Sequence, residues 1–192
     1  MLIVGYGNPL RGDDGVGQEV AEVLAVHLAG TGASTVLAHQ LLPELALDAS
    51  RSQLVVFIDA AVGEPAGSVS VQPLTPVAGP PADPAAAAAR ATSTAGAFSH
   101  QLGAADVLAL ARDLYGACPE AVLVRVGSGR LELGAGLSAA VRGAVPRAAQ
   151  AVLAAIDVAQ RAGGACGEPA KPMTRVPYAL GGGTVHQSEH CG

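Results

Sequence analysis

The chain has 192 residues, of which 50% are hydrophobic, 14% charged and 3% aromatic, and its formal net charge is -5. This length suits one domain with a sizeable core, whereas the acidic balance disfavours a broad nucleic-acid-binding surface. The three cysteines are an odd number at wide spacing, which argues against a disulfide framework.

The apolar segments are too short for a membrane span, and the first residues do not resemble an export signal. No apolar run reaches the roughly eighteen residues that a membrane span needs. The start of the chain lacks the basic segment and small-residue cleavage site of a signal peptide. We therefore expect a cytoplasmic protein, and a monomer that has neither a nucleic acid nor a membrane as partner.

Strand-like and helix-like patterns alternate along the chain. In chain order, they predict a strand over residues 2–6, a helix from 16 to a stop at Gly30, a strand over 34–38, a short helix over 44–50, a strand over 53–58 and an edge strand over 67–71. A long loop over 73–97, with one helical turn at 85–90, precedes a helix over 102–114, strands over 121–126 and 130–133, and a helix over 139–161. Ser138 is a suitable N-cap for the last helix.

This alternation of strands and helices predicts the fold class. Strand–helix units with short connections favour an α/β fold, a single three-layer domain with a mostly parallel twisted sheet and helices on both faces. We assign this domain to residues 1–162. Residues 163–192 mix glycine, proline and polar residues, a composition typical of a disordered tail.

The stretch GYGNPLRGDDGVG, residues 5–17, directly follows the first predicted strand. A dinucleotide-binding loop would need a third glycine where Leu10 stands. A phosphate would also meet the carboxylates of Asp13 and Asp14 at the helix start, where an anion ought to dock. The loop therefore favours a cation, or hydrogen-bond donors of a partner, over a phosphate.

Two further polar residues are expected near this loop. Asp59 ends the strand over 53–58, and His100 lies just ahead of the helix over 102–114. Ligands of open α/β sheets bind beyond the carboxyl ends of the strands, so Asp14, Asp59 and His100 are expected to converge there. Two carboxylates and an imidazole suit Ni²⁺, Zn²⁺ or Fe²⁺. These residues also have structural interpretations: Asp13 or Asp14 as a helix cap, Asp59 as a strand-end turn residue and His100 as a helix start.

Three segments, in this order and spacing, resemble the nickel-iron hydrogenase maturation endopeptidases. They are GYGNPLRGDDGVG, VVFIDA at 55–60 and SHQLGAADVLALA at 99–111. The resemblance extends from residue 1 to about residue 156 and includes the GLS turn at 136–138. The chain departs from the family at 126–128, which lack its Gln-Pro or Glu-Pro pair, and after residue 162, where the tail has no counterpart.

The resemblance implies a peptidase that removes a short C-terminal extension from the precursor of a hydrogenase large subunit once nickel is installed. It implies that Asp14, Asp59 and His100 contact the metal and carry out catalysis. Nickel would arrive with the bound precursor and would not be held by the free enzyme. We expect Gly7, Asn8 and Asp13 to contact the substrate.

Other functions remain open at this point. A phosphorylated receiver domain also carries an acidic pair after its first strand, but here the pair lies across a glycine loop and no lysine precedes Lys171. A non-catalytic docking module that senses nickel is a second alternative. Within the enzyme class, the aspartates could act without metal as a carboxylate pair. His39 and Glu44 could contact substrate or serve as ordinary surface residues.

Overall fold

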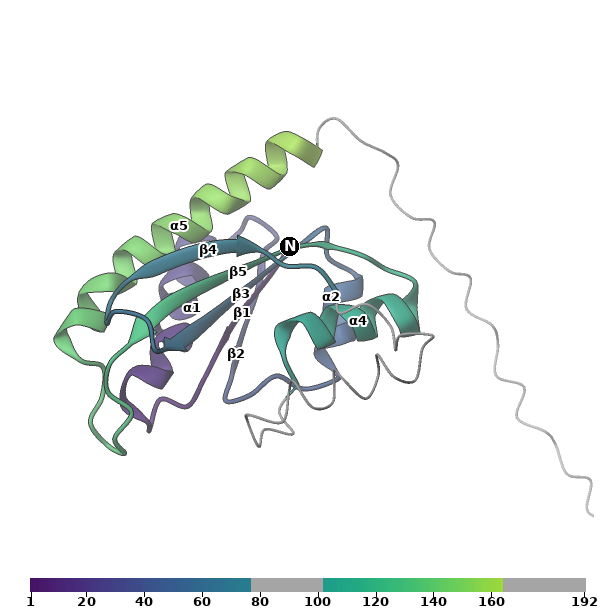
Figure 1. Ribbon diagram of the computed structural model, residues 1–192. Coiled ribbons are helices and arrows are strands. Elements are labelled where there is room, and N and C mark those ends of the chain that lie inside the picture. The colour runs from purple at the N-terminus through teal and green to yellow at the C-terminus, as the bar shows by residue number, and fades with distance from the viewer. Residues whose placement is uncertain (77–101, 164–192) are drawn as a thin grey trace, which may run out of the picture.

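The structure is a computed structural model that describes residues 1–76 and 102–163 (Figure 1). Three predictions lie outside these ranges: the helical turn at 85–90, the surroundings of His100, and the tail after residue 163.

A single sheet of five strands forms the middle layer. The strands are β1 (Leu2–Tyr6), β2 (Ser34–Ala38), β3 (Leu54–Val62), β4 (Val69–Pro73) and β5 (Glu120–Ser128). Their order across the sheet is β2-β1-β3-β5-β4. All neighbours are parallel except β4, which runs antiparallel to β5 at one edge. The predicted mostly parallel sheet is therefore confirmed, including the edge position of β4.

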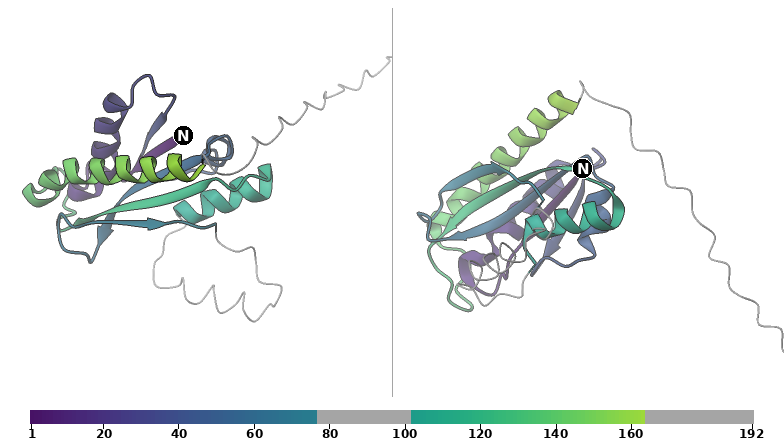
Figure 2. Two further views of the ribbon diagram at one scale, coloured as in Figure 1. Left: turned by 90° about the horizontal axis from the view of Figure 1, so that it is seen from above. Right: turned by 45° about the vertical axis from the view of Figure 1, so that its right-hand side comes forward.

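Helices cover both faces of the sheet, as Figures 1 and 2 show. They are α1 (Val16–His27), preceded by the 3₁₀ turn η1 (Gly12–Gly15), α2 (Leu45–Ser50), α4 (Ala104–Tyr115) and α5 (Ala139–Gly163). The helices α1 and α5 pack on one face, while α2 and α4 pack on the other. None of these described helices is both long and apolar enough to cross a membrane.

The continuous apolar runs of the central strands are explained by burial on both sides. Along β1, Ile3 belongs to the cluster under α1 and α5, whereas Leu2 and Val4 belong to the cluster under α2 and α4. Along β3, Val56 belongs to the cluster under α1 and α5, and Phe57 belongs to the cluster under α2 and α4. Successive side chains of a strand point to opposite faces, so a strand with a helix layer on each side needs apolar residues throughout.

Two strand predictions need correction. The sequence predicts that the strand over 53–58 ends at Asp59, but β3 continues to Val62, and Asp59 pairs with Arg125 of β5 inside the sheet. The strand predicted over 130–133 is a loop. The main-chain N–H of Arg130 donates to the carboxylate of Asp13, so a side chain takes the place that a partner strand would fill.

The start of α1 lies unusually close to the sheet. A Cβ atom at Gly17 would meet the carbonyl oxygens of Tyr6 in β1 and Ile58 in β3, and one at Gly5 would meet the carbonyl of Gly17. Two of the glycines in GYGNPLRGDDGVG thus bring a helix against strand backbone. They position the loop between β1 and α1 without any need for a bound phosphate.

This contact predicts opposite effects of two Gly→Ala substitutions. Gly17→Ala should destabilise the fold by at least about 1–3 kcal/mol, because the added methyl group meets backbone that cannot turn away. Gly143→Ala, in α5, adds its methyl group to open space and should stabilise the fold by about 0.5–1 kcal/mol through helix propensity. Urea unfolding of both variants measures the difference, and equal midpoints would contradict the close packing.

Candidate active site

A cavity of about 310 Å³ opens at the carboxyl ends of β1, β2 and β3. The residues that line it are Tyr6, Gly7, Asn8, Arg11, Asp14, His39, Gln40, Leu41, Asp59 and Leu102. They include two of the three residues predicted to converge, Asp14 and Asp59. The topology explains this meeting, since parallel strands deliver their carboxyl ends to one edge of the sheet.

The first carboxylate, Asp14, is held by the turn that leads into α1. Its Oδ2 accepts a hydrogen bond from the main-chain N–H of Asn8 at 2.9 Å. The Asn8 side chain in turn accepts one from the N–H of Leu10 at 2.9 Å, so it braces the loop. Gly7 has a φ of 128°, and a Cβ there would meet the main-chain carbonyl of Asp14. Only glycine fits this position, and the turn it permits directs Asp14 to the cavity.

The second carboxylate, Asp59, lies in β3 and is partly buried. The hydroxyl of Tyr6 donates a hydrogen bond to its Oδ2 at 2.8 Å. Burial raises the pKa of Asp59 above its usual range, and the negative charge of Asp14 acts in the same direction. The Tyr6 hydrogen bond and the charge of Arg125 oppose this rise without cancelling it. Arg125 is itself engaged in an ion pair with Glu64 at 2.9 Å.

Tyr6 is a site residue that the sequence analysis missed. It ends β1, and its hydroxyl reaches across to the neighbouring strand β3. Burial, followed by the charge of Asp59, raises the pKa of Tyr6, so its hydroxyl remains a donor. A tyrosine at the end of a buried strand needs a partner for its hydroxyl, and that requirement is the signal that could have identified it.

Asp13 occupies a different environment from its neighbour Asp14. It is fully buried, and one of its oxygens accepts from the main-chain N–H groups of Gly129 and Arg130, both at 2.9 Å. Ser138 donates to the carboxylate from its main-chain N–H at 2.6 Å and from its hydroxyl at 3.0 Å. Burial alone would raise the pKa of Asp13, but these four donors hold it below the usual range.

The predicted roles of Asp13 therefore need correction. Its carboxylate does not line the cavity, so it is not placed to contact a substrate, and it does not cap the helix that follows it. Instead it ties η1 to the connection between β5 and α5. The hydroxyl of Ser138 also accepts from the N–H of Val141 at 3.4 Å, in agreement with its predicted place at the start of the last helix.

The third predicted ligand, His100, lies outside the described residues. Among residues 1–76 and 102–163, no group of three or more His, Cys, Asp or Glu side chains is arranged to hold a metal ion. That part of the chain therefore contributes two carboxylates to the cavity, while His39, at the end of β2, also lines it.

The chain is similar to several solved structures. The hydrogenase maturating endopeptidase HybD from E. coli has 26% sequence identity and a TM-score of 0.63, over 82% of this chain and 91% of that one. The NiFe hydrogenase maturation proteases HybD and HycI from Thermococcus kodakarensis both have TM-scores of 0.58, at 22% and 24% identity. They cover 80% and 81% of this chain, and 97% and 91% of their own. No protein-family model and no curated protein sequence matches.

The contrast between neighbouring carboxylates predicts unequal effects on stability. Asp13→Asn should cost about 2–4 kcal/mol at neutral pH, because an amide NH₂ would face buried donors that now bond to a charged group. Asp14→Asn keeps an oxygen that can accept from Asn8 and should change the free energy of unfolding by less than about 1 kcal/mol. Urea unfolding at pH 7 compares them.

The pH dependence of the Asp13→Asn effect follows from its pKa. A lowered pKa means that Asp13 stabilises the fold above its unfolded-state pKa and loses this effect as the pH falls through the folded-state pKa. The difference in the free energy of unfolding between wild type and Asp13→Asn should therefore become smaller in acid. A gap that stays constant with pH would show that the charge of Asp13 is not what stabilises the fold.

The effect of Asp59→Asn on stability should depend on pH in the opposite direction to that of Asp13→Asn. A raised pKa means that folding favours the protonated form, so stability is greatest at low pH and is lost as the pH rises through the folded-state pKa. The neutral amide in this variant avoids that loss and can still accept from Tyr6. The melting temperature of Asp59→Asn should exceed that of the wild type at pH 8 and approach it in acid, while Asp48→Asn, outside the site, serves as the control.

Proposed function

We propose that this chain, whose fold is similar to that of the NiFe hydrogenase maturation proteases, is an endopeptidase that removes the C-terminal extension of a hydrogenase large-subunit precursor. The observation that carries this proposal is the pair of carboxylates, Asp14 and Asp59, in one cavity at the carboxyl edge of the sheet. The fold that brings them together is the one shared with the maturation proteases.

The precursor's nickel would be recognised as part of the substrate. We propose Asp14, Asp59 and His100 as the residues that contact it, with the nickel supplied by the precursor. Two carboxylates and an imidazole are a suitable set of donors for this ion. Three protein ligands also leave coordination positions for groups of the precursor. Gly7 and Asn8 line the same cavity and are proposed to contact the precursor chain.

Hydrolysis of a peptide bond needs a base for the attacking water and an acid for the leaving amine. In the free enzyme burial raises the pKa of Asp59, so in a mechanism in which nickel does not bind its carboxylate, Asp59 would take up and release this proton. The hydroxyl of Tyr6 fixes the orientation of its carboxylate. The metal carried by the precursor would polarise the scissile carbonyl.

A mechanism without metal is a second candidate, and one observation favours it. The charge of Asp14 contributes to the raised pKa of Asp59, so the two carboxylates interact electrostatically. In this second mechanism one carboxylate would act as base for the water and the other as acid for the leaving amine. In that mechanism nickel would serve recognition only, or would not be needed.

Nickel-loaded and nickel-free precursors distinguish these candidates. The proposal predicts cleavage of the loaded precursor only, seen as loss of the extension by mass spectrometry. Equal cleavage of both forms would favour the aspartate pair. Binding of the loaded precursor without any cleavage would instead identify a nickel-sensing docking module.

Single substitutions test the site residues. Asp59→Asn and His100→Ala should lower the cleavage rate at least ~100-fold, the range expected when a proton-transfer or ligand group is lost. For Asp14 the expected order of rates is wild type, then Asp14→Glu, then Asp14→Asn, because Glu keeps the charge and only displaces it. Circular dichroism confirms that each variant is folded. A wild-type rate in any of them would remove that residue from the site.

The proposed function also implies a compartment, an oligomeric state and a partner. We propose that the protein acts in the cytoplasm and as a monomer, with the hydrogenase precursor as its partner. Light scattering of the purified chain alone tests whether it is a monomer, and light scattering of its mixture with the precursor tests whether the two bind.

A further inference from the structure

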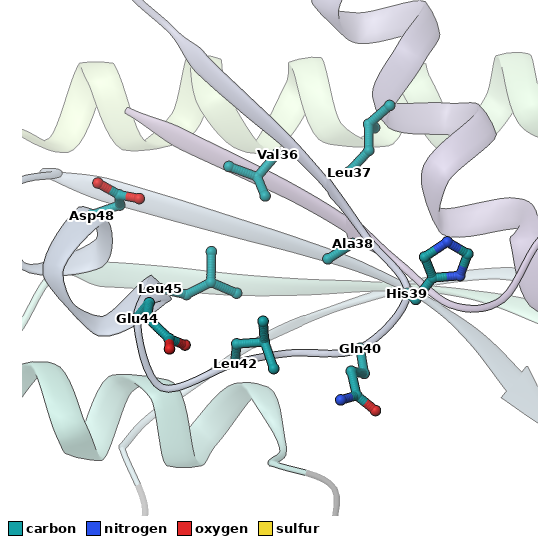
Figure 3. Close-up of a pocket in the computed structure, with 9 residues that line it drawn as sticks. All are labelled: Val36, Leu37, Ala38, His39, Gln40, Leu42, Glu44, Leu45 and Asp48. Atoms are coloured by element: carbon teal, nitrogen blue, oxygen red, sulfur yellow. The ribbon is translucent and has the colours of Figure 1, made fainter.

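A second cavity, of about 520 Å³, adjoins the candidate active site along β2 (Figure 3). His39 and Gln40 line both cavities, so the two lie side by side. Figure 3 shows the strand with Val36, Leu37 and Ala38 on one side and Leu42, Leu45 and Glu44 opposite it. We call this second cavity the β2 groove.

The β2 groove follows the free edge of the sheet. It touches the consecutive residues Val36, Leu37 and Ala38, whose side chains alternate between the two faces of the sheet. A cavity that contacts all three must therefore run along the edge of the strand. Within the described residues, β2 is the last strand on this side of the sheet and pairs with β1 alone.

The direction of the main-chain groups follows from two hydrogen bonds. The N–H of Ser34 donates to Met1 at 3.0 Å, and the carbonyl of Ala38 accepts from Gly7 at 3.1 Å. Residues 34, 36 and 38 thus direct their N–H and carbonyl groups toward β1. By alternation, those of Thr35 and Leu37 point to the free edge. Leu37 presents a donor and an acceptor to the β2 groove.

The side chains of the β2 groove are apolar and accessible. Leu37 is 44% exposed and Leu42 is 47% exposed. Both leucines lie beside the open strand edge, where a strand added to β2 would contact them. The carboxylates of Glu44 and Asp48 stand at the same groove and disfavour an acidic segment there.

We propose that the β2 groove binds the precursor segment next to the scissile bond as an extended strand added to the edge of β2. Main-chain hydrogen bonds to Leu37 would align it, and an apolar side chain on the face of Val36 would cover Leu42. This inference rests on the proposed function. A peptide bond held at Asp14 and Asp59 requires the chain on one side of it to leave the cavity, and the shared residues His39 and Gln40 lead directly into the β2 groove.

Kinetics with the nickel-loaded precursor test the side-chain contact. Leu42→Lys should raise KM about 10-fold and leave kcat within about 2-fold, because it removes binding that is equal in the ground and transition states. Val158→Lys is the matched control, since Val158 is 63% exposed but lies on α5 and should leave KM unchanged.

A proline substitution tests the main-chain contact. Leu37→Pro removes an N–H that points away from β1, and proline is tolerated on edge strands for that reason. Its KM should exceed that of Leu37→Ala, which loses the same side chain but keeps the donor. Equal KM values for these two variants would overturn strand addition at Leu37.

Amide hydrogen exchange supplies a measurement independent of turnover. In the slowly cleaving Asp59→Asn variant, which keeps Asp14 and His100, a saturating concentration of nickel-loaded precursor should slow exchange at the Leu37 amide about 10-fold or more. Exchange that stays unchanged, or an amide already protected in the free enzyme by another segment or a second copy, would overturn the proposal. Failure of the wild type to cleave the precursor would remove the proposed function itself, whereas normal cleavage with an unchanged KM in Leu42→Lys removes only the β2 groove.

Discussion

The buried carboxylate of Asp13 joins parts of the chain that are far apart in sequence. It accepts four hydrogen bonds from Gly129, Arg130 and Ser138, and the N–H of Asp13 donates to the carbonyl of Arg130 at 2.8 Å. These contacts attach η1 to the loop after β5 and to the start of α5. Because Asp14 is the next residue in η1, its direction toward the cavity depends on this attachment.

The three aspartates of the region show how environment divides one chemical group among different tasks. Four donors surround Asp13, so its charge is stabilised and its pKa falls. Asp59 is partly buried near another acid, so its charge is disfavoured and its pKa rises. The first arrangement stabilises the fold, whereas the second costs stability at neutral pH and supplies a carboxylate suited to proton transfer. A site that works through Asp59 is therefore maintained by contacts such as those of Asp13.

The open sheet connects this chemistry to substrate binding. The carboxyl ends of β1, β2 and β3 place the two carboxylates in one cavity, and the outer position of β2 leaves a strand edge beside it. Cleavage requires an extended peptide, and a free strand edge is a surface that can hold a peptide in that conformation. The same strand order thus accounts for the candidate site and for the proposed β2 groove.

Local patterns in the sequence were sufficient to predict the strands over 2–6 and 34–38, the helices and the mostly parallel sheet, because burial on one or both faces leaves a periodic signal. They also brought Asp14 and Asp59 to one edge, since strand ends of parallel sheets share that edge. The roles of Asp13, Tyr6 and residues 130–133 depended on contacts between distant segments. Asp13 and Asp14 are adjacent and identical in type, and only the 3₁₀ turn, which points one inward and the other to the cavity, distinguishes them.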